Sequence, residues 1–271
     1  MSAPTAPPAV GSAPAPARRP RGRAAFAVAA AVLVAAAATD ALGEMAATST
    51  TRTDAFAQVA GTLTVVGDDG DVDVRTGPAT GELTVTTTVR DGWSRASTSA
   101  ELVDGALRLS SSCGGGGWLS PCQVSYVVTV PEDPALELDV RTGAGDQSYR
   151  GTFAAVRTEL GVGDLDWSGA EAQLLVVDTG AGDVDVEGAV QDLAASTGAG
   201  DVEVDLESAP QRVDVRTGTG DASVRLPAAT PYRVEVDSGL GDEQVEVASD
   251  PASPRLVRIT TSVGDASVEG R

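Results

Sequence analysis

The sequence predicts an all-β protein whose main part is a single-stranded β-solenoid, similar to a parallel β-helix, of about 7–8 coils. Three observations predict this fold. The motif T-G-x-G-D recurs along the chain, apolar and polar residues alternate on both sides of it, and no segment between the motifs has a helical period. Because one such unit cannot bury its own apolar side, the copies are expected to stack on one another.

The aspartate at the end of the motif gives the length of the repeat. It occurs at Asp71, Asp146, Asp164, Asp183, Asp201, Asp221, Asp242 and Asp265. The last seven of these residues are 18, 19, 18, 20, 21 and 23 positions apart. A unit of this length with two short strands is too short for a propeller blade or a helical repeat. Each repeat unit is therefore predicted to form one coil, about 4.8 Å from the next coil.

The glycines of the motif predict the corners between strands. Two glycines separated by one residue are typical of a tight turn with positive φ angles. These turn glycines are Gly143, Gly145, Gly180, Gly182, Gly198, Gly200, Gly218, Gly220, Gly239 and Gly241. Before the corner at 218–220, Val213 and Val215 alternate with polar residues, and Val224 and Leu226 do so after it, as in half-buried strands.

Stacked corners would place the aspartates in one column, and two interpretations of that column are open. In the first, each carboxylate accepts hydrogen bonds from the backbone N–H groups of its own turn. In the second, bound Ca²⁺ neutralises the column, with candidate ligands Asp146, Asp164, Asp183, Asp201, Asp221, Asp242 and Asp265. Calcium-binding β-rolls have a period of about nine residues, half of the period here, so turn capping is favoured and no cofactor is predicted.

Between residues 78 and 134 the repeat is interrupted by longer β-patterns. Asp104 and Gly105 separate two of them, as in a two-residue β-hairpin. Cys113 and Cys122 are the only two cysteines, and in an oxidising compartment they are expected to form a disulfide. Two thiols without a neighbouring histidine make an incomplete zinc site. This segment therefore predicts antiparallel strands, held by the disulfide, toward the N-terminal end of the solenoid.

The chain before the repeats indicates export. Residues 1–23 are rich in Pro, Ala and Arg and are expected to be disordered. Residues 24–42 contain an apolar run with two interpretations. It is either a single membrane anchor, with the repeats outside the cell, or the h-region of a signal whose cleavage secretes them. Residues 43–54 are assigned to a linker, and 55–271 to the repeat domain.

Composition disfavours several classes of function. The first 39 residues hold four arginines and no acid, which leaves 15 arginines against 39 acidic residues, a net charge of 15 − 39 = −24. Such a surface repels nucleic acid. The chain has no His and no Lys, so most general-base and Schiff-base chemistry lacks a residue, and we expect no enzyme. A carbohydrate-active β-helix enzyme with a carboxylate pair such as Asp164 and Asp166 is the alternative.

Several residues that differ between repeats are candidates for ligand binding on the faces of the solenoid. They are Gln147, Tyr149, Asp166, Trp167, Arg216 and Arg225. Trp167 takes the position that Val186 has in the next repeat, so we expect it in the core rather than stacked on a sugar. The C-terminal coil has no capping helix, which makes it a candidate surface for self-association.

The repeat, the arginine-then-apolar N-terminus and the stretch Cys122–Pro131 together resemble the putative adhesin family of bacterial envelope β-strand-repeat proteins, a domain-of-unknown-function family. The resemblance covers roughly residues 55–271, and the motif is incomplete at Leu160 and Ser262. It implies a β-solenoid, an exported or membrane-anchored location and no catalytic residues. We therefore expect a non-enzymatic, membrane-anchored surface scaffold that contacts a protein or polysaccharide. A calcium-binding or self-assembling surface protein is the alternative.

Overall fold

The computed structural model describes residues 48–56, 61–78, 81–92, 95–103, 105–114, 122–133 and 135–271. The disordered tail predicted at 1–23 and the anchor or signal predicted at 24–42 lie outside these residues. Within them, no helix is long and apolar enough to cross a membrane. The first strand begins at Thr48, inside the predicted linker 43–54, so the folded part starts earlier than predicted.

The described residues form one mixed sheet of nineteen strands, so the all-β prediction is confirmed. The strands are β1 (Thr48–Phe56), β2 (Thr62–Asp69), β3 (Val72–Gly77), β4 (Leu83–Asp91), β5 (Ala96–Val103), β6 (Ala106–Cys113), β7 (Cys122–Pro131), β8 (Glu137–Ala144), β9 (Gln147–Arg150), β10 (Thr152–Val162), β11 (Leu165–Ala181), β12 (Val184–Ala199), β13 (Val202–Leu206), β14 (Arg212–Thr219), β15 (Ala222–Leu226), β16 (Arg233–Ser238), β17 (Glu243–Glu246), β18 (Leu256–Val263) and β19 (Ala266–Gly270).

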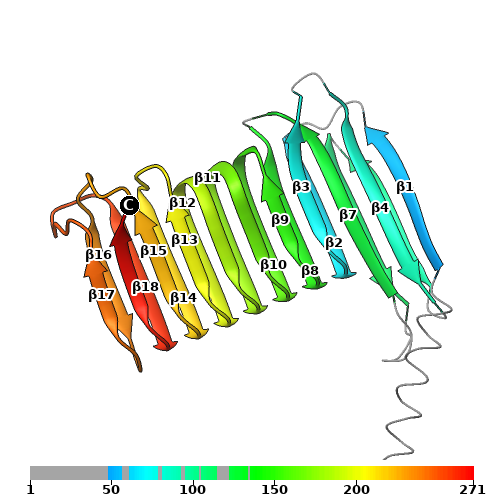
Figure 1. Cartoon of the computed structure of the whole chain (residues 1–271). Coiled ribbons are helices and arrows are strands. Elements are labelled where there is room, and N and C mark those ends of the chain that lie inside the picture. Colours follow the sequence, from blue (N-terminus) through cyan, green and yellow to red (C-terminus); the bar gives the residue numbers. More distant parts are fainter. Residues whose placement is uncertain are drawn as a thin grey trace, which may run out of the picture. The chain divides into compact units, whose positions relative to one another are not determined.

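The sheet curls at the corners into two stacked rows of parallel strands (Figure 1). We call two strands joined by one corner a layer. The first row runs in the order β6, β2, β8, β10, the second half of β11, the second half of β12, β14, β18 and β16. The second row runs in the order β7, β3, β9, the first half of β11, the first half of β12, β13, β15, β19 and β17.

At one end of the stack the pairing becomes antiparallel. Strand β4 pairs antiparallel with β7, and β1 pairs antiparallel with β4, so both extend the second row. Strand β5 extends the first row by pairing antiparallel with β6, with Val103 opposite Ala106. This pairing confirms the hairpin predicted from Asp104 and Gly105.

The layers do not stack in the order of the sequence. Strands β18 and β19 lie between the β14–β15 layer and the β16–β17 layer. The C-terminal coil is therefore an interior layer, which corrects the prediction that it forms the open end. Glu243 gives a reason, because its register partner is Ala266, whose own partner is the buried Ala222. A carboxylate in that inward position is tolerated only where water reaches it, so the layer with Glu243 has to be the end layer.

Valine and leucine columns from both rows fill the space between them. Trp167 is 0% exposed, which confirms its predicted place in the core. Its ring centroid lies 5.8 Å from that of Tyr149 and 5.8 Å from that of Phe153, and its Nε1–H donates to the Ala170 carbonyl over 3.1 Å. This aromatic cluster is the bulkiest part of the core and fixes the β9–β11 region.

Gln147 and Tyr149 are also buried, so the prediction that they lie on an outer face is wrong. Gln147 directly follows the corner aspartate and so takes the inward position that Leu165 has in the next layer. The interior accepts it because its amide is satisfied. Tyr149 Oη donates to Gln147 Oε1 over 2.7 Å, and Gln147 Nε2 donates to Thr142 Oγ1 over 2.7 Å. Complete burial raises the pKa of the Tyr149 phenol.

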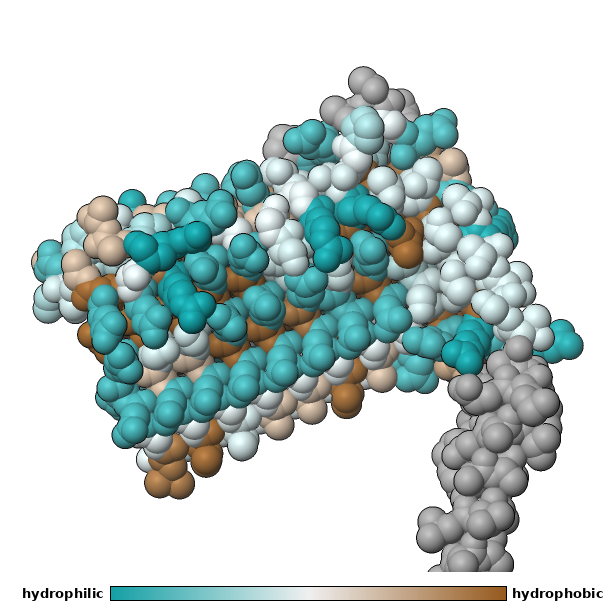
Figure 2. Space-filling view, in the orientation of Figure 1, coloured by the Kyte–Doolittle hydropathy of each residue, from teal (hydrophilic) through white to brown (hydrophobic). Residues whose placement is uncertain are grey.

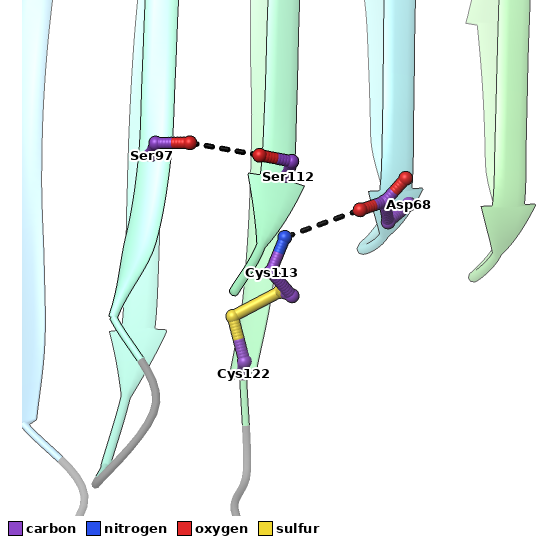
Figure 3. The surroundings of a disulfide bond; sticks show 5 residues. All are labelled: Asp68, Ser97, Ser112, Cys113 and Cys122. Carbon is purple, nitrogen blue, oxygen red and sulfur yellow. Dashed lines mark hydrogen bonds between the residues drawn. A yellow bond between two sulfur atoms is a disulfide. The ribbon is translucent and has the colours of Figure 1, made fainter. Parts of the chain in front are cut away.

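Cys113 and Cys122 form a disulfide that joins the end of β6 to the start of β7, as predicted (Figure 3). The N–H of Cys113 donates to Asp68 Oδ2 over 3.2 Å, and Ser97 Oγ and Ser112 Oγ lie 2.8 Å apart across β5 and β6. Because β6 belongs to the first row and β7 to the second, the disulfide ties the two rows together at this end of the stack.

Loss of this disulfide is expected to weaken the antiparallel end. The bond spans a sequence separation of 9. Closing a loop of that size stabilises a protein by about 2–3 kcal/mol, mainly by restricting the unfolded chain. The variant Cys113→Ser/Cys122→Ser should therefore lose about 2–3 kcal/mol of unfolding free energy in urea. The parent chain treated with dithiothreitol is the control and should lose the same amount. An unchanged midpoint in both would show that strand pairing alone holds the rows together.

Candidate functional site

Each part of the T-G-x-G-D motif contacts the neighbouring layer. The threonine is buried, and in three layers its hydroxyl donates to a glycine carbonyl of the layer before it, whereas the Thr179 hydroxyl has no hydrogen-bond partner among the described residues. The three examples are Thr197 to Gly182 over 3.0 Å, Thr217 to Gly200 over 3.1 Å, and Thr261 to Gly220 over 3.1 Å. Because these hydrogen bonds run between layers, the motif holds neighbouring layers together in addition to turning the chain.

The two glycines of the motif are required for different reasons. The second glycine has a positive φ, for example +144° at Gly200 and +138° at Gly220. The first glycine does not, so the predicted positive φ is wrong for that position. It is needed because a Cβ at Gly198 would lie 2.5 Å from the Gly180 carbonyl oxygen of the neighbouring layer. The first position requires glycine because two backbones approach closely there. The second position requires glycine for the same reason and also because its φ is positive.

The corner aspartates form a continuous ladder, which we call the aspartate ladder. In each step, the backbone N–H of one aspartate donates to Oδ1 of the aspartate in the neighbouring layer, over 2.7–3.1 Å. The donor–acceptor pairs are Asp146 to Asp71, Asp164 to Asp146, Asp183 to Asp164, Asp201 to Asp183, Asp221 to Asp201, Asp265 to Asp221, and Asp242 to Asp265. Each carboxylate thus accepts from the next layer's aspartate and not from its own turn as predicted. Figure 2 shows a continuous hydrophilic row along the stack, in keeping with the exposed ladder.

The second row carries a group of outward carboxylates beside the ladder, which we call the acidic face. Its members are Asp166, Asp185, Glu187, Glu203 and Asp205. They are in register across β11, β12 and β13, so strand pairing holds them one strand apart, about 4.8 Å. Partial burial, and then the carboxylates of Glu203, Asp166 and Glu187, raise the pKa of Asp185.

Arginines border the acidic face on two sides. Arg150 binds Asp166 over 3.1 Å on one side. On the other side, Arg225 binds Glu203 over 2.7 Å, and the C-terminal Arg271 reaches back to Asp205 over 2.8 Å. All of these side chains are at least 30% exposed, so the pairs add little stability and mainly fix where positive charge lies. The charge in the middle of the face stays negative.

A family profile described as Toastrack DUF4097 matches residues 63–269. The chain belongs to this family. The resemblance to an adhesin-like family of unknown function is thereby confirmed. Solved structures similar to the chain include a putative adhesin from Bacteroides fragilis, with 13% identity, a TM-score of 0.46, and coverage of 83% of this chain and 97% of that one. A putative cell adhesion protein from Clostridium sporogenes has 12% identity, a TM-score of 0.40, and coverage of 83% and 100%. No curated protein matches.

In this Toastrack chain, Asp164 and Asp166 do not form an isolated acid–base pair. Oδ1 of Asp164 accepts the Asp183 N–H over 2.9 Å, and Asp166 is held by Arg150 and Ser168. The same pattern recurs one layer on, at Asp183 and Asp185. Repetition of the arrangement is typical of a stacked surface and gives no unique reactive centre.

The remaining predicted residues of this family member divide between the two rows. Arg225 lies beside the acidic face, whereas Arg216 lies on the first row and binds Asp214 over 2.8 Å. The calcium candidates are the members of the aspartate ladder. Within the described residues, no group of three or more Cys, Asp or Glu side chains is arranged to hold a metal ion. The candidate site is therefore the acidic face with its arginine borders.

Substitutions at Asp201 are expected to separate the hydrogen bond of the ladder from its charge. Asp201→Ala removes the acceptor for the Asp221 N–H and should cost about 0.5–1.5 kcal/mol. Asp201→Asn keeps an oxygen acceptor and removes one of the stacked charges, which repel by about 0.8 kcal/mol per adjacent pair in water. Its unfolding free energy in urea should equal or exceed that of the parent. Equal losses in both variants would show that the negative charge itself is needed, as for a bound cation.

Proposed function

We propose that the chain is a non-enzymatic, exported and membrane-anchored β-solenoid of the bacterial cell envelope that acts as a surface binding scaffold. The apolar run at 24–42 and the cysteine pair support the exported location. Stacking contacts occupy the residues of the repeat, and the carboxylate pattern recurs from layer to layer. Both features suit a scaffold better than an enzyme.

The observation that carries the proposal is the acidic face. Its carboxylates stand on strands that are locked in register by the corner motif, so binding a partner there costs little conformational entropy. The excess of negative charge selects a partner with amines or guanidinium groups, such as a basic protein or an amine-bearing polysaccharide. Binding through such a surface should weaken as ionic strength rises.

Localisation and binding are tested on the full chain in cells. Protease added to intact cells should remove residues beyond the anchor, and deletion of 24–42 should release the chain from the membrane fraction. Cells displaying the chain should bind chitosan, an amine-bearing polysaccharide. Asp185→Asn/Glu187→Gln/Glu203→Gln should bind less than the parent. Glu159→Gln/Asp178→Asn/Asp237→Asn removes the same charge from the first row and should bind like the parent. Equal binding by both variants would exclude the acidic face.

Calcium binding is the first alternative, and the ladder argues against it. One oxygen of each carboxylate from Asp71 to Asp265 already accepts a backbone N–H, which reduces the oxygens left for Ca²⁺. We expect the thermal midpoint of the full chain to stay the same in calcium and in excess EDTA. A saturable rise in the midpoint with calcium would instead make the ladder a cation site, since a ligand that binds the folded state stabilises it.

Self-assembly is the second alternative, and the end layer is where a second copy could add. Among the described strands, β16 and β17 each have one unpaired edge; Leu240, between the two strands, is 71% exposed, and Val245 of β17 is 45% exposed. Light scattering of the full chain over a range of concentrations distinguishes a monomeric scaffold from an assembling one. A Leu240→Asp/Val245→Asp variant should dissolve any assembly that uses this end.

A further inference from the structure

A cleft of about 600 Å³ lies at the antiparallel end of the stack, away from the acidic face. Strands β1 and β4 form one wall, β5 and β6 form the other, and Tyr126 of β7 also lines the cleft. The volume falls in the range of small-molecule sites, about 300–1,000 Å³. We call it the end cleft. It exists because the two rows of strands continue beyond the last corner. Among the described residues, no side chain fills the space between β1 of one row and β5 of the other.

The end cleft changes from apolar to polar toward its mouth. Val85, Val89 and Leu109 line its inner part. On β1, strand alternation points Arg52 and Asp54 to the same side as their register partners Thr87 and Val85. Arg52 Nη2 lies 2.7 Å from Asp54 Oδ1, so a paired guanidinium and carboxylate stand at the rim. The rim therefore offers both hydrogen-bond donors and acceptors without a large net charge.

Tyr126 lines the inner part of the cleft, and the hydroxyl of Ser111, which is not a lining residue, lies next to the Tyr126 hydroxyl. Tyr126 is 2% exposed and Ser111 is 8% exposed, and within the described residues neither hydroxyl has a hydrogen-bond partner of normal geometry. Burial raises the pKa of the Tyr126 phenol, and the adjacent Ser111 hydroxyl offsets part of that rise. The two hydroxyls are thus neighbours, Tyr126 on β7 and Ser111 on β6. A buried polar group without a partner destabilises the fold, and a ligand that supplies a partner would recover that loss.

We infer that the end cleft binds a short, neutral oligosaccharide, with the Tyr126 hydroxyl and the Arg52–Asp54 pair as its hydrogen-bonding groups. A sugar supplies hydroxyls that both donate and accept, and its C–H faces suit the ring of Phe56 and the aliphatic wall. An acyl chain would leave the buried Tyr126 hydroxyl without a partner. An anion would meet Asp54 and Glu101, and a cation would meet Arg52.

This inference rests on the proposed surface-binding function and names a second, salt-independent site for it. The test is a glycan array of neutral, acidic and amino-sugar oligosaccharides probed with the purified full chain. Neutral glycans should bind, and Tyr126→Phe should weaken that binding by about three- to tenfold, the effect of one or two lost hydrogen bonds. Because the variant removes an unpartnered hydroxyl, its thermal midpoint should not fall. Tyr232→Phe is the control, since its hydroxyl contacts Pro227 elsewhere in the fold.

A second pair of variants tests the cleft itself. Ala100 faces the cleft from β5 and Ala199 lies on an exposed corner. Ala100→Phe should abolish glycan binding, and Ala199→Phe should leave it intact. Binding that survives Ala100→Phe, a lower midpoint for Tyr126→Phe, or an array without neutral glycan signals would each overturn the inference. Chitosan binding through the acidic face is measured separately at low and high salt. A negative result for the cleft therefore does not decide whether the proposed function is correct.

Discussion

Gly200→Ala is expected to destabilise the stack by more than about 4 kcal/mol, an exceptional loss for the addition of one methyl group. Gly200 has a φ of +144°, where a residue with a Cβ is strained. In addition, its Cβ would lie 2.1 Å from the Gly182 carbonyl oxygen and 2.6 Å from the carbonyl carbon. That carbonyl also accepts the Thr197 hydroxyl, so it has no freedom to move away without losing a second contact between layers.

Two further glycines separate strain from contact. Gly169 has a φ of +58°, and nothing lies within 4 Å of the place that an added methyl group would take. Gly169→Ala should therefore cost only about 1–2 kcal/mol for the left-handed backbone. Gly198 has no positive φ, and Gly198→Ala would report the contact with Gly180 alone. Urea unfolding, monitored by circular dichroism, measures the loss of unfolding free energy in all three variants. Equal losses at Gly200 and Gly169 would show that neighbouring layers can separate at little cost, against the tight stacking described above.

Local features of the fold could be predicted from the sequence because they depend on the spacing of residues along the chain. Alternation placed strands on both sides of each corner, and it placed Trp167 in the core with Val186 as its register partner. The pairing of Cys113 with Cys122 followed from there being no other cysteine. Alternation counted from the corner would also have placed Gln147 inside, but its polar side chain pointed the prediction to the surface.

Features that depend on which layers are neighbours could not be predicted. Nearly every layer carries the same corner, with departures only at Leu160 and Ser262, so a copy fits about equally well beside several others. The sequence therefore does not say that β18–β19 precedes β16–β17 in space. Glu243 in an inward position was the one local signal. The hydrogen-bond partner of each corner aspartate depends on the same choice of neighbour. The end cleft was missed for a related reason, because its lining comes from five strands, β1, β4, β5, β6 and β7, and the sequence does not show that β1 and β5 face each other.

The order of the layers makes deletion of residues 255–271 more damaging than its length suggests. That deletion removes β18 and β19, with the fully buried Val257, Ile259 and Val268. Among the described strands, β18 is the lateral neighbour of β16, and β19 is the lateral neighbour of β17. We therefore expect the deletion to unfold the β16–β17 layer as well, so that limited proteolysis cleaves the chain from about residue 229 onward.

Deletion of 229–271 is the matched control, because it removes both layers and ends the stack at β15. Both variants then expose the β14–β15 edge, but only the shorter deletion leaves Val234 and Val236 without a partner strand. The longer deletion should give the cleaner unfolding transition and the lower tendency to aggregate. Protection of residues 233–246 in the shorter deletion would contradict this expectation. It would mean that β16–β17 moves into the vacated place, and hence that the corner motif alone, rather than the side chains of each layer, selects the neighbour.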